Sequence, residues 1–245
     1  MSDPLHDAGY VVLDHDRDVL AWAEAARDVG LKVLADDTSR RHGGTWFVGV
    51  DALPNKADGS IAGVPLAGSF LDHVKPQEVW HQAQLSVVFP GYPCKDADES
   101  DAAHRFRLNR DAAHVDGLLP EGAERRRHLR EPHSFILGLP LDDCPASPLV
   151  VWRGSHHLIG TAFRAAFEGL SADQWGEIDV TDVYQAARRE AFAHCERLEL
   201  PLRRGQAVVL HRHLLHGVAP WQVETEHPHR MIAYFRPQAA FADWL

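Results

Sequence analysis

Residues 204–217 read RGQAVVLHRHLLHG, and this stretch says most about the fold. Its apolar run 207–210 favours a β-strand, and the glycines at 205 and 217 indicate turns on either side. Similar short apolar runs recur at residues 10–13, 45–50, 63–66, 86–90, 134–141, 149–152 and 231–235. Many short strands separated by turns predict a β-barrel or a double-sheet jelly roll.

Two segments carry a helical pattern instead. Apolar residues in the segment 19–26 follow helical spacing, and Gly30 is predicted to end that helix. Residues 160–198 contain SADQ at 171–174, which resembles a capping box, and an Ala-, Arg- and Glu-rich stretch at 182–198. We therefore predict one domain over residues 1–245: a mainly β fold with flanking helices, a double-stranded β-helix (jelly-roll, cupin-like) barrel. Its helical insertion at about 160–198 is a candidate lid.

Composition limits the classes of function. The 245 residues include 25 basic and 35 acidic side chains, a formal net charge of −10, and 45% of them are hydrophobic. Sequence-independent binding to nucleic acid needs a basic footprint, so we expect no nucleic-acid partner. The one basic run, residues 125–130, is expected to be a solvated face.

Cysteine usage and hydropathy indicate the compartment. The chain has three cysteines and no CxxC motif, which disfavours a disulfide framework or a structural zinc site and favours a reducing compartment. Its first residues lack the apolar segment of a signal peptide, and no run approaches the length of a membrane span. We therefore expect a cytoplasmic protein with no membrane partner; the sequence leaves its oligomeric state open.

The chain contains two His-x-Asp/Glu motifs, and about two are expected by chance in so histidine-rich a sequence. His194 and Glu196 lie in a segment of helical pattern, where side chains at i and i+2 point in different directions. His114 and Asp116 precede Gly117 in a non-helical segment, where side chains at i and i+2 face the same side. Local context therefore selects His114 and Asp116 as the candidate metal ligands.

Histidines at 211, 213 and 216 compete for a third ligand position. We select His216, because it lies in the apolar, strand-like piece 214–219, where a buried imidazole needs a polar partner. With His114 and Asp116 it forms a set of two histidines and one carboxylate. Such a facial triad holds Fe(II) in non-heme oxygenases and leaves coordination positions open.

Arg230 lies fourteen residues after His216 and begins the strand-like stretch RMIAYFR. Alternation along a strand places Arg230, Ile232, Tyr234 and Arg236 on one face. An arginine fixed on a strand can bind a carboxylate through two hydrogen bonds. Taken singly, His216 also fits a core histidine and Arg230 a surface arginine; their combination with the His-x-Asp motif predicts an iron site with an anion-binding arginine.

Four pieces of the chain occur in an order and spacing typical of one family. They are His114-x-Asp116, FILGLPLDD at 135–143, PLVVWRGSHH at 148–157, and the stretch 204–217 with the later RMIAYFRP at 230–237. On these pieces the chain resembles the phytanoyl-CoA dioxygenase-like family of Fe(II)/2-oxoglutarate-dependent oxygenases.

The resemblance implies a site and a reaction. His114, Asp116 and His216 would bind Fe(II), and Arg230 would pair with the distal carboxylate of 2-oxoglutarate. The expected enzyme uses O₂ and 2-oxoglutarate to hydroxylate, or otherwise oxidise, a C–H bond of a small-molecule substrate. Halogenating relatives replace the carboxylate ligand with a small residue, so Asp116 favours hydroxylation. Side chains near the motif pieces would suit an anionic substrate: Arg153, His156, Arg212, His213 and Arg236.

The chain departs from the family pattern at two positions. Val218 stands where members often have a hydroxyl residue, and Gly138 stands where a bulky aromatic residue is common. Another residue must therefore supply the secondary contacts to 2-oxoglutarate.

Two other functions fit the same scaffold. The first is a cupin-type metal enzyme that does not use 2-oxoglutarate, although it leaves Arg230 without a role. The second is a non-catalytic small-molecule sensor, which would bind 2-oxoglutarate without turning it over.

Overall fold

The computed structural model describes residues 3–37, 39–222 and 226–245. Its strands form a six-stranded sheet in the order β1-β9-β6-β11-β3-β2, a three-stranded sheet β10-β7-β8 and a hairpin β4-β5. The larger sheet consists of β1 (Tyr10–Leu13), β2 (Trp46–Leu53), β3 (Ala83–Val88), β6 (Phe135–Pro140), β9 (Ala207–His211) and β11 (Arg230–Phe235). The other strands are β4 (Leu118–Glu121), β5 (Arg126–Leu129), β7 (Leu149–Trp152), β8 (Arg197–Leu200) and β10 (His216–Val218). All strand pairs are antiparallel.

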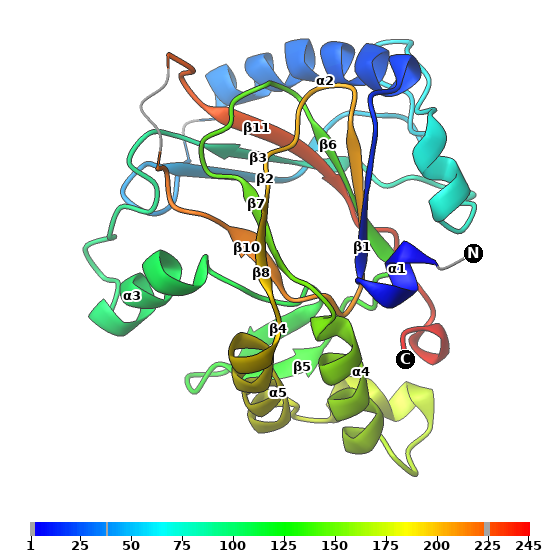
Figure 1. The fold of residues 1–245 in the computed structure, drawn as a ribbon, viewed down its shortest axis with the longest axis vertical. Coiled ribbons are helices and arrows are strands. Elements are labelled where there is room, and N and C mark those ends of the chain that lie inside the picture. Colours follow the sequence, from blue (N-terminus) through cyan, green and yellow to red (C-terminus); the bar gives the residue numbers. More distant parts are fainter. Residues whose placement is uncertain (1–2, 38, 223–225) are drawn as a thin grey trace.

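The helices lie outside the two main sheets. Helix α2 covers the larger sheet, whereas α4 and α5 lie beside the smaller one (Figure 1). The helices are α1 (Pro4–Asp7), α2 (Arg17–Asp36), α3 (Asp101–Arg110), α4 (Ser155–Ala166) and α5 (Thr181–His194), with 3₁₀ turns η1 (Ser69–His73), η2 (Ala172–Glu177) and η3 (Phe241–Asp243). The resulting order of layers is helix, sheet, sheet, helices.

Strand β11 shows how its sequence divides between two cores. Met231, Ala233 and Phe235 belong to the apolar cluster that includes α2 residues. Ile232 and Tyr234 belong to a second cluster, which includes Leu149 and Val151 of the facing sheet. The predicted alternation is therefore confirmed, and the face that carries Arg230 and Arg236 points into the space between the sheets.

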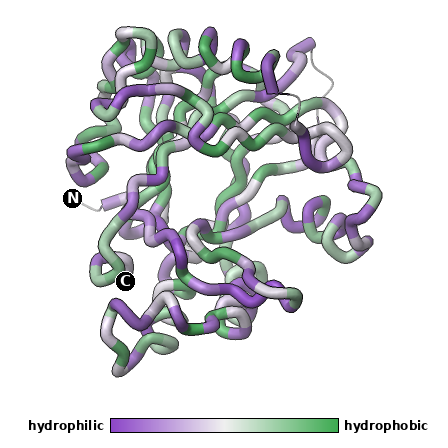
Figure 2. Tube along the Cα trace, turned by 180° about the vertical axis from the view of Figure 1, so that it is seen from behind, coloured by the Kyte–Doolittle hydropathy of each residue, from purple (hydrophilic) through white to green (hydrophobic). Residues whose placement is uncertain are grey.

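Helix α2 is amphipathic, and apolar and polar stretches alternate along it (Figure 2). Its prediction was correct in place but wrong at its end, because the helix continues past Gly30 to Asp36. Gly30 is buried, and a Cβ there would lie 3.3 Å from Leu85 and 3.4 Å from Met231. This glycine therefore serves close packing of the helix on the sheet and does not end the helix.

Between β7 and β8 the chain forms α4, η2 and α5. The capping box predicted at Ser171 and Gln174 is present at the start of η2. The predicted helix 182–198 is too long, because α5 ends at His194 and β8 begins at Arg197. β8 pairs with β7, so sheet formation overrides the helical composition of these last residues.

The predicted fold class is confirmed: the chain is mainly β with flanking helices, and its two facing antiparallel sheets are those of a double-stranded β-helix. The sheets are not joined into a closed barrel. Residues 63–66, predicted as a strand, contribute only an isolated bridge between Ile61 and Val64. Among the described residues, no helix has the length and apolar character needed to cross a membrane.

Candidate metal centre

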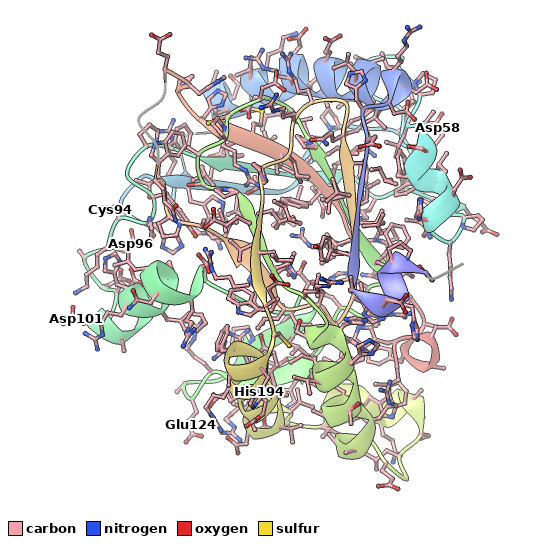
Figure 3. The ribbon with its side chains drawn as sticks, in the orientation of Figure 1. Asp58, Cys94, Asp96, Asp101, Glu124 and His194 are labelled. Carbon is pink, nitrogen blue, oxygen red and sulfur yellow. The ribbon has the colours of Figure 1, made fainter. Side chains whose placement is uncertain are left out.

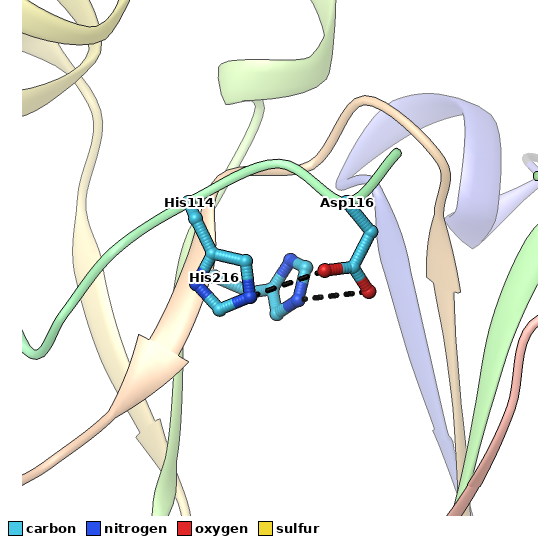
Figure 4. A group of neighbouring side chains, drawn as sticks. All are labelled: His114, Asp116 and His216. Carbon is cyan, nitrogen blue, oxygen red and sulfur yellow. Dashed lines mark ion pairs between the residues drawn. The ribbon is translucent and has the colours of Figure 1, made fainter. Parts of the chain in front are cut away.

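Three predicted ligands meet in the space between the sheets. His114 and His216 turn their imidazoles toward the Asp116 carboxylate (Figure 4). The His114 Nε2 lies 3.1 Å from Asp116 Oδ1, and the His216 Nε2 lies 3.8 Å from Asp116 Oδ2. One ligand atom from each residue lies within 4.8 Å of the others. Two imidazoles and a carboxylate at such separations can hold one metal ion.

The backbone orients both rings. His114 Nδ1 is 3.0 Å from the Ala112 carbonyl, and His216 Nδ1 is 2.9 Å from the Leu214 carbonyl. Because a carbonyl only accepts hydrogen bonds, each Nδ1 carries a proton, and in the neutral imidazole Nε2 then keeps a free electron pair. A hydrogen bond of this kind on the far nitrogen is typical of metal-binding histidines. Both Nε2 atoms therefore face Asp116 as the nitrogens that could coordinate a metal.

Close contact between two backbone segments brings the ligands together. His114 pairs with His216 through reciprocal backbone hydrogen bonds of 2.8 and 3.1 Å. This approach requires Gly217, because a Cβ there would lie 2.2 Å from the Asp111 carbonyl oxygen. His216 also pairs in register with Val151, whose side chain belongs to the cluster between the sheets. Strand register thus directs the His216 imidazole inward.

The helical insertion and the smaller sheet hold the His-x-Asp segment in place. The Tyr184 hydroxyl, on α5, accepts a hydrogen bond of 3.0 Å from the Val115 N–H, and Tyr184 is 3% exposed. Arg197, on β8, donates two hydrogen bonds of 2.7 and 2.8 Å to the Asp111 carboxylate. The insertion, a candidate lid by its sequence, supports the segment that carries His114 through this contact of Tyr184 on α5.

Electrostatics keep the Asp116 carboxylate charged and the His216 imidazole neutral. Burial disfavours the charged form of Asp116, but the Arg236 guanidinium and the two histidines together outweigh it, so the pKa of Asp116 is well below its usual value. Burial lowers the pKa of His216 to about 4, so its imidazole is neutral at pH 7. The Arg236 Nε lies 2.5 Å from Asp116 Oδ2. We predicted Arg236 as a contact for an anionic substrate; here it contacts the carboxylate of the triad.

Arg230 is buried on the same face of β11 and is only 4% exposed. Its Nη1 has no hydrogen-bond partner, and its guanidinium makes no ion pair with any residue in the described part of the chain. A buried cation without a counterion is costly. Within residues 3–37, 39–222 and 226–245, no carboxylate therefore pairs with this guanidinium between the two sheets.

The departure at Gly138 has a structural explanation. Gly138 on β6 pairs in register with Tyr234 on β11. A Cβ at Gly138 would lie 2.9 Å from Val208 and 3.0 Å from the Tyr234 ring. Gly138 therefore leaves room for an aromatic ring that the neighbouring strand supplies, and that ring belongs to the cluster between the sheets.

The second His-x-Asp/Glu motif, His194-x-Glu196, does not belong to the candidate metal centre. His194 is at the end of α5 with a side chain that is 69% exposed (Figure 3), and Glu196 follows outside the helix. The expected reason, a shared helix, was therefore wrong for Glu196. His211 and His213 contact each other and not the triad: the His213 N–H donates to His211 Nδ1 over 3.1 Å.

A second group of possible ligands occurs near α3. His42, Asp96 and Glu99 place ligand atoms within 4.8 Å of one another, with Asp96 beside α3 in Figure 3. The Asp96 carboxylate already accepts hydrogen bonds from the backbone N–H groups of His42 and Gly43, and Arg107 contacts Glu99. The chain itself therefore satisfies the Asp96 carboxylate and gives Glu99 a cationic partner, and we assign no metal to this group.

Sequence reasoning missed Arg197, Gln84, which accepts a hydrogen bond of 2.7 Å from Arg236 Nη1, and the hydrogen bond by which Tyr184 supports the site. Each acts through a contact between residues more than 60 positions apart, and no local spacing announces such a contact.

Comparison with solved structures supports the fold. The chain is similar to SnoN, a non-heme alpha ketoglutarate dependent epimerase from nogalamycin biosynthesis, with 13% identity, a TM-score of 0.51, and coverage of 95% of this chain and 79% of that one. It is also similar to EvdMO1, with 16% identity, a TM-score of 0.50, and coverage of 96% and 49% respectively. No family model and no curated protein matches the sequence.

Proposed function

We propose that the chain is an Fe(II)- and 2-oxoglutarate-dependent oxygenase that oxidises a C–H bond of a small-molecule substrate, hydroxylation being the expected outcome. The observation that carries the proposal is the cluster of His114, Asp116 and His216, with ligand atoms within 4.8 Å of one another between two sheets. The similarity to SnoN, which is named as alpha ketoglutarate dependent, supports the choice of co-substrate.

The donor set fits ferrous iron. Two neutral imidazoles and one carboxylate are typical of non-heme iron oxygenases, whereas structural zinc sites close with four ligands, most often including cysteine. The three cysteines are free, and none belongs to the cluster. Iron bound here would supply the redox chemistry that couples decarboxylation of 2-oxoglutarate to oxidation of the substrate.

The structure distinguishes Arg230, the first residue of β11, from Arg236, which follows its last residue. Arg236 already donates to Asp116 over 2.5 Å and to Gln84 over 2.7 Å. Arg230 has a free Nη1 in a buried position. A planar guanidinium matches the geometry of a carboxylate. Arg230 therefore binds the distal carboxylate of 2-oxoglutarate, and the co-substrate removes an unpaired charge from the protein interior.

Exposure of the ligands indicates the direction of approach. The His114 side chain is 44% exposed, whereas the Asp116 and His216 side chains are 12% and 7% exposed. The substrate therefore reaches the centre from the side of His114. Arg230 and Tyr234 lie in the interior, where co-substrate binding excludes water.

The test uses anaerobic protein with Fe(II) and 2-oxoglutarate. We expect a weak visible charge-transfer band, and release of succinate when O₂ and a mixture of candidate metabolites are added. Asp116→Ala should abolish both. His194→Ala is the matched control, because it removes the exposed histidine of the other His-x-Asp/Glu motif. A band that persists in Asp116→Ala would contradict the ligand assignment.

The outcomes also separate the alternatives. Metal binding without any band on addition of 2-oxoglutarate would favour a cupin-type enzyme that does not use this co-substrate. A band without succinate release in any substrate mixture would favour a sensor.

A further inference from the structure

The Asp116 carboxylate is held on both sides. Its Oδ1 is the oxygen closer to His114, at 3.1 Å from Nε2. Its Oδ2 is 2.5 Å from Arg236 Nε. Oδ1 thus faces the His114 imidazole, whereas Oδ2, which lies 3.8 Å from His216 Nε2, is engaged by a guanidinium that is itself largely buried, with a side chain 19% exposed.

Arg236 is fixed from a second direction. Its Nη1 donates a hydrogen bond of 2.7 Å to Gln84 Oε1 on β3, and its backbone N–H donates to His81 Nε2 over 2.6 Å. Gln84 pairs in register with Tyr234, two residues before Arg236. The guanidinium therefore bridges β3 and the His-x-Asp segment.

We propose that Arg236, anchored by Gln84, is a positioning residue that restricts Asp116 to binding metal through Oδ1 alone. The inference rests on the proposed iron site. A carboxylate that binds through both oxygens would take an additional coordination position, and 2-oxoglutarate chemistry needs the positions that a facial triad leaves open. Removing a residue that hydrogen-bonds to a metal ligand typically lowers the metal affinity about 10- to 100-fold. We expect a loss of this order when Arg236 is replaced.

Arg236 is suited to this role because it has several donors in a fixed plane. Nε serves Asp116 and Nη1 serves Gln84 at the same time. A lysine keeps the charge but has a single, mobile ammonium group, so it should hold Asp116 less firmly. Arg236→Lys is therefore expected to restore part of the function lost in Arg236→Gln.

The experiment measures binding of Co²⁺ as a stand-in for Fe(II), by visible absorption of the Co²⁺ complex, together with thermal unfolding of the metal-free protein. For Arg236→Gln we expect a Kd for Co²⁺ raised about 10- to 100-fold. We also expect an altered Co²⁺ spectrum, because the carboxylate is free to bind through both oxygens. Gln84→Leu, which keeps Arg236 but removes its anchor, should shift the same spectrum with a smaller loss of affinity.

Arg126→Gln is the matched control, because Arg126 also pairs with carboxylates, those of Asp179 and Asp182, on the molecular surface. It should leave the Co²⁺ Kd and spectrum unchanged. The proposal is overturned if folded Arg236→Gln keeps the Co²⁺ Kd and spectrum of the unmodified protein. If Arg236→Gln does not fold, the same result for Gln84→Leu overturns it. Asp116→Ala distinguishes failure of the proposed metal centre from failure of the positioning role of Arg236. Unchanged Co²⁺ binding in that variant would refute the metal centre itself, and not only the role of Arg236.

Discussion

Replacing Arg230 with methionine should have opposite effects on co-substrate binding and on stability. Arg230 is 4% exposed, its Nη1 lacks a partner, and no carboxylate of the described residues pairs with it. Methionine has a similar length and no charge. Removal of one partner of a buried, hydrogen-bonded charge pair costs about 2–5 kcal/mol. The Kd for 2-oxoglutarate should therefore rise about 30- to 4,000-fold.

Without 2-oxoglutarate, the substitution of Arg230 should leave the free energy of unfolding unchanged or raise it. Arg230 then has no counterion in the described part of the chain, and replacing buried charges with apolar side chains of similar volume is often neutral or stabilises proteins by about 1–4 kcal/mol. For a domain of this size each kcal/mol shifts the Tm by about 2–4 °C. The Arg230→Met protein should thus melt at the same or a higher temperature than the unmodified protein when both lack the co-substrate.

The assay is a titration with 2-oxoglutarate under anaerobic conditions, followed by calorimetry, and a thermal melt without co-substrate. Arg189→Met on the exposed surface of α5 is the control for loss of one arginine, and it should change neither quantity. A 2-oxoglutarate Kd within threefold of the unmodified value would refute the role of Arg230. A large drop in Tm without co-substrate would show that the guanidinium has an internal structural partner.

Three further predictions concern the frame around the site. Tyr184→Phe leaves the buried Val115 N–H without an acceptor, which should destabilise the protein by about 1–3 kcal/mol and weaken Co²⁺ binding; equal Tm and Kd would contradict it. Gly217→Ala places a Cβ against the Asp111 carbonyl oxygen and should abolish Co²⁺ binding, whereas a variant that binds normally would show that the segments can separate without loss. Burial lowers the pKa of His211 to about 3, below its value in the unfolded chain. The contribution of neutral His211 to the free energy of unfolding is therefore complete above about pH 6.5 and is lost as the pH falls toward 3. Urea unfolding at pH 4 to 7 should show a smaller pH slope for His211→Asn, by up to about 1.4 kcal/mol per pH unit; equal slopes would refute this.

Strands β1, β7, β9 and β11 were predictable because each is a short apolar run bounded by turn residues, whereas β5 and β8, with the sequences RRHL and RLEL, were not predicted. β1 and β7 have the predicted limits, and β9 and β11 each differ by one residue. The errors arose where tertiary contacts decide. Gly30 continues a helix because Leu85 and Met231 pack closely against it, and residues 197 and 198 join β8 because β7 offers a pairing edge.

The candidate ligands were also accessible from the sequence, since an extended His-x-Asp segment presents both side chains on one side. Their supports were not. Tyr184 is 69 positions from Val115, and Arg236 is 120 positions from Asp116. Nothing in the local pattern around either residue indicates its distant partner.

Sequence reasoning does not distinguish Arg230, the first residue of β11, from Arg236, which follows its last residue. Strand alternation places Arg230 and Arg236 on the same face, and their chemistry is identical. Only the fold makes them different, because the His-x-Asp segment reaches Arg236, whereas no described residue pairs with the Arg230 Nη1. In the two proposals above, one cation orients a ligand within the protein and the other binds an anion from outside. The two substitutions should therefore have different effects: Arg236→Gln should chiefly raise the Kd for metal, and Arg230→Met should chiefly raise the Kd for 2-oxoglutarate at saturating metal.

Because these arginines have no partner in common, the losses of the double variant should add on a free-energy scale. Strong non-additivity in the 2-oxoglutarate titration would show that Arg236 also contacts the co-substrate.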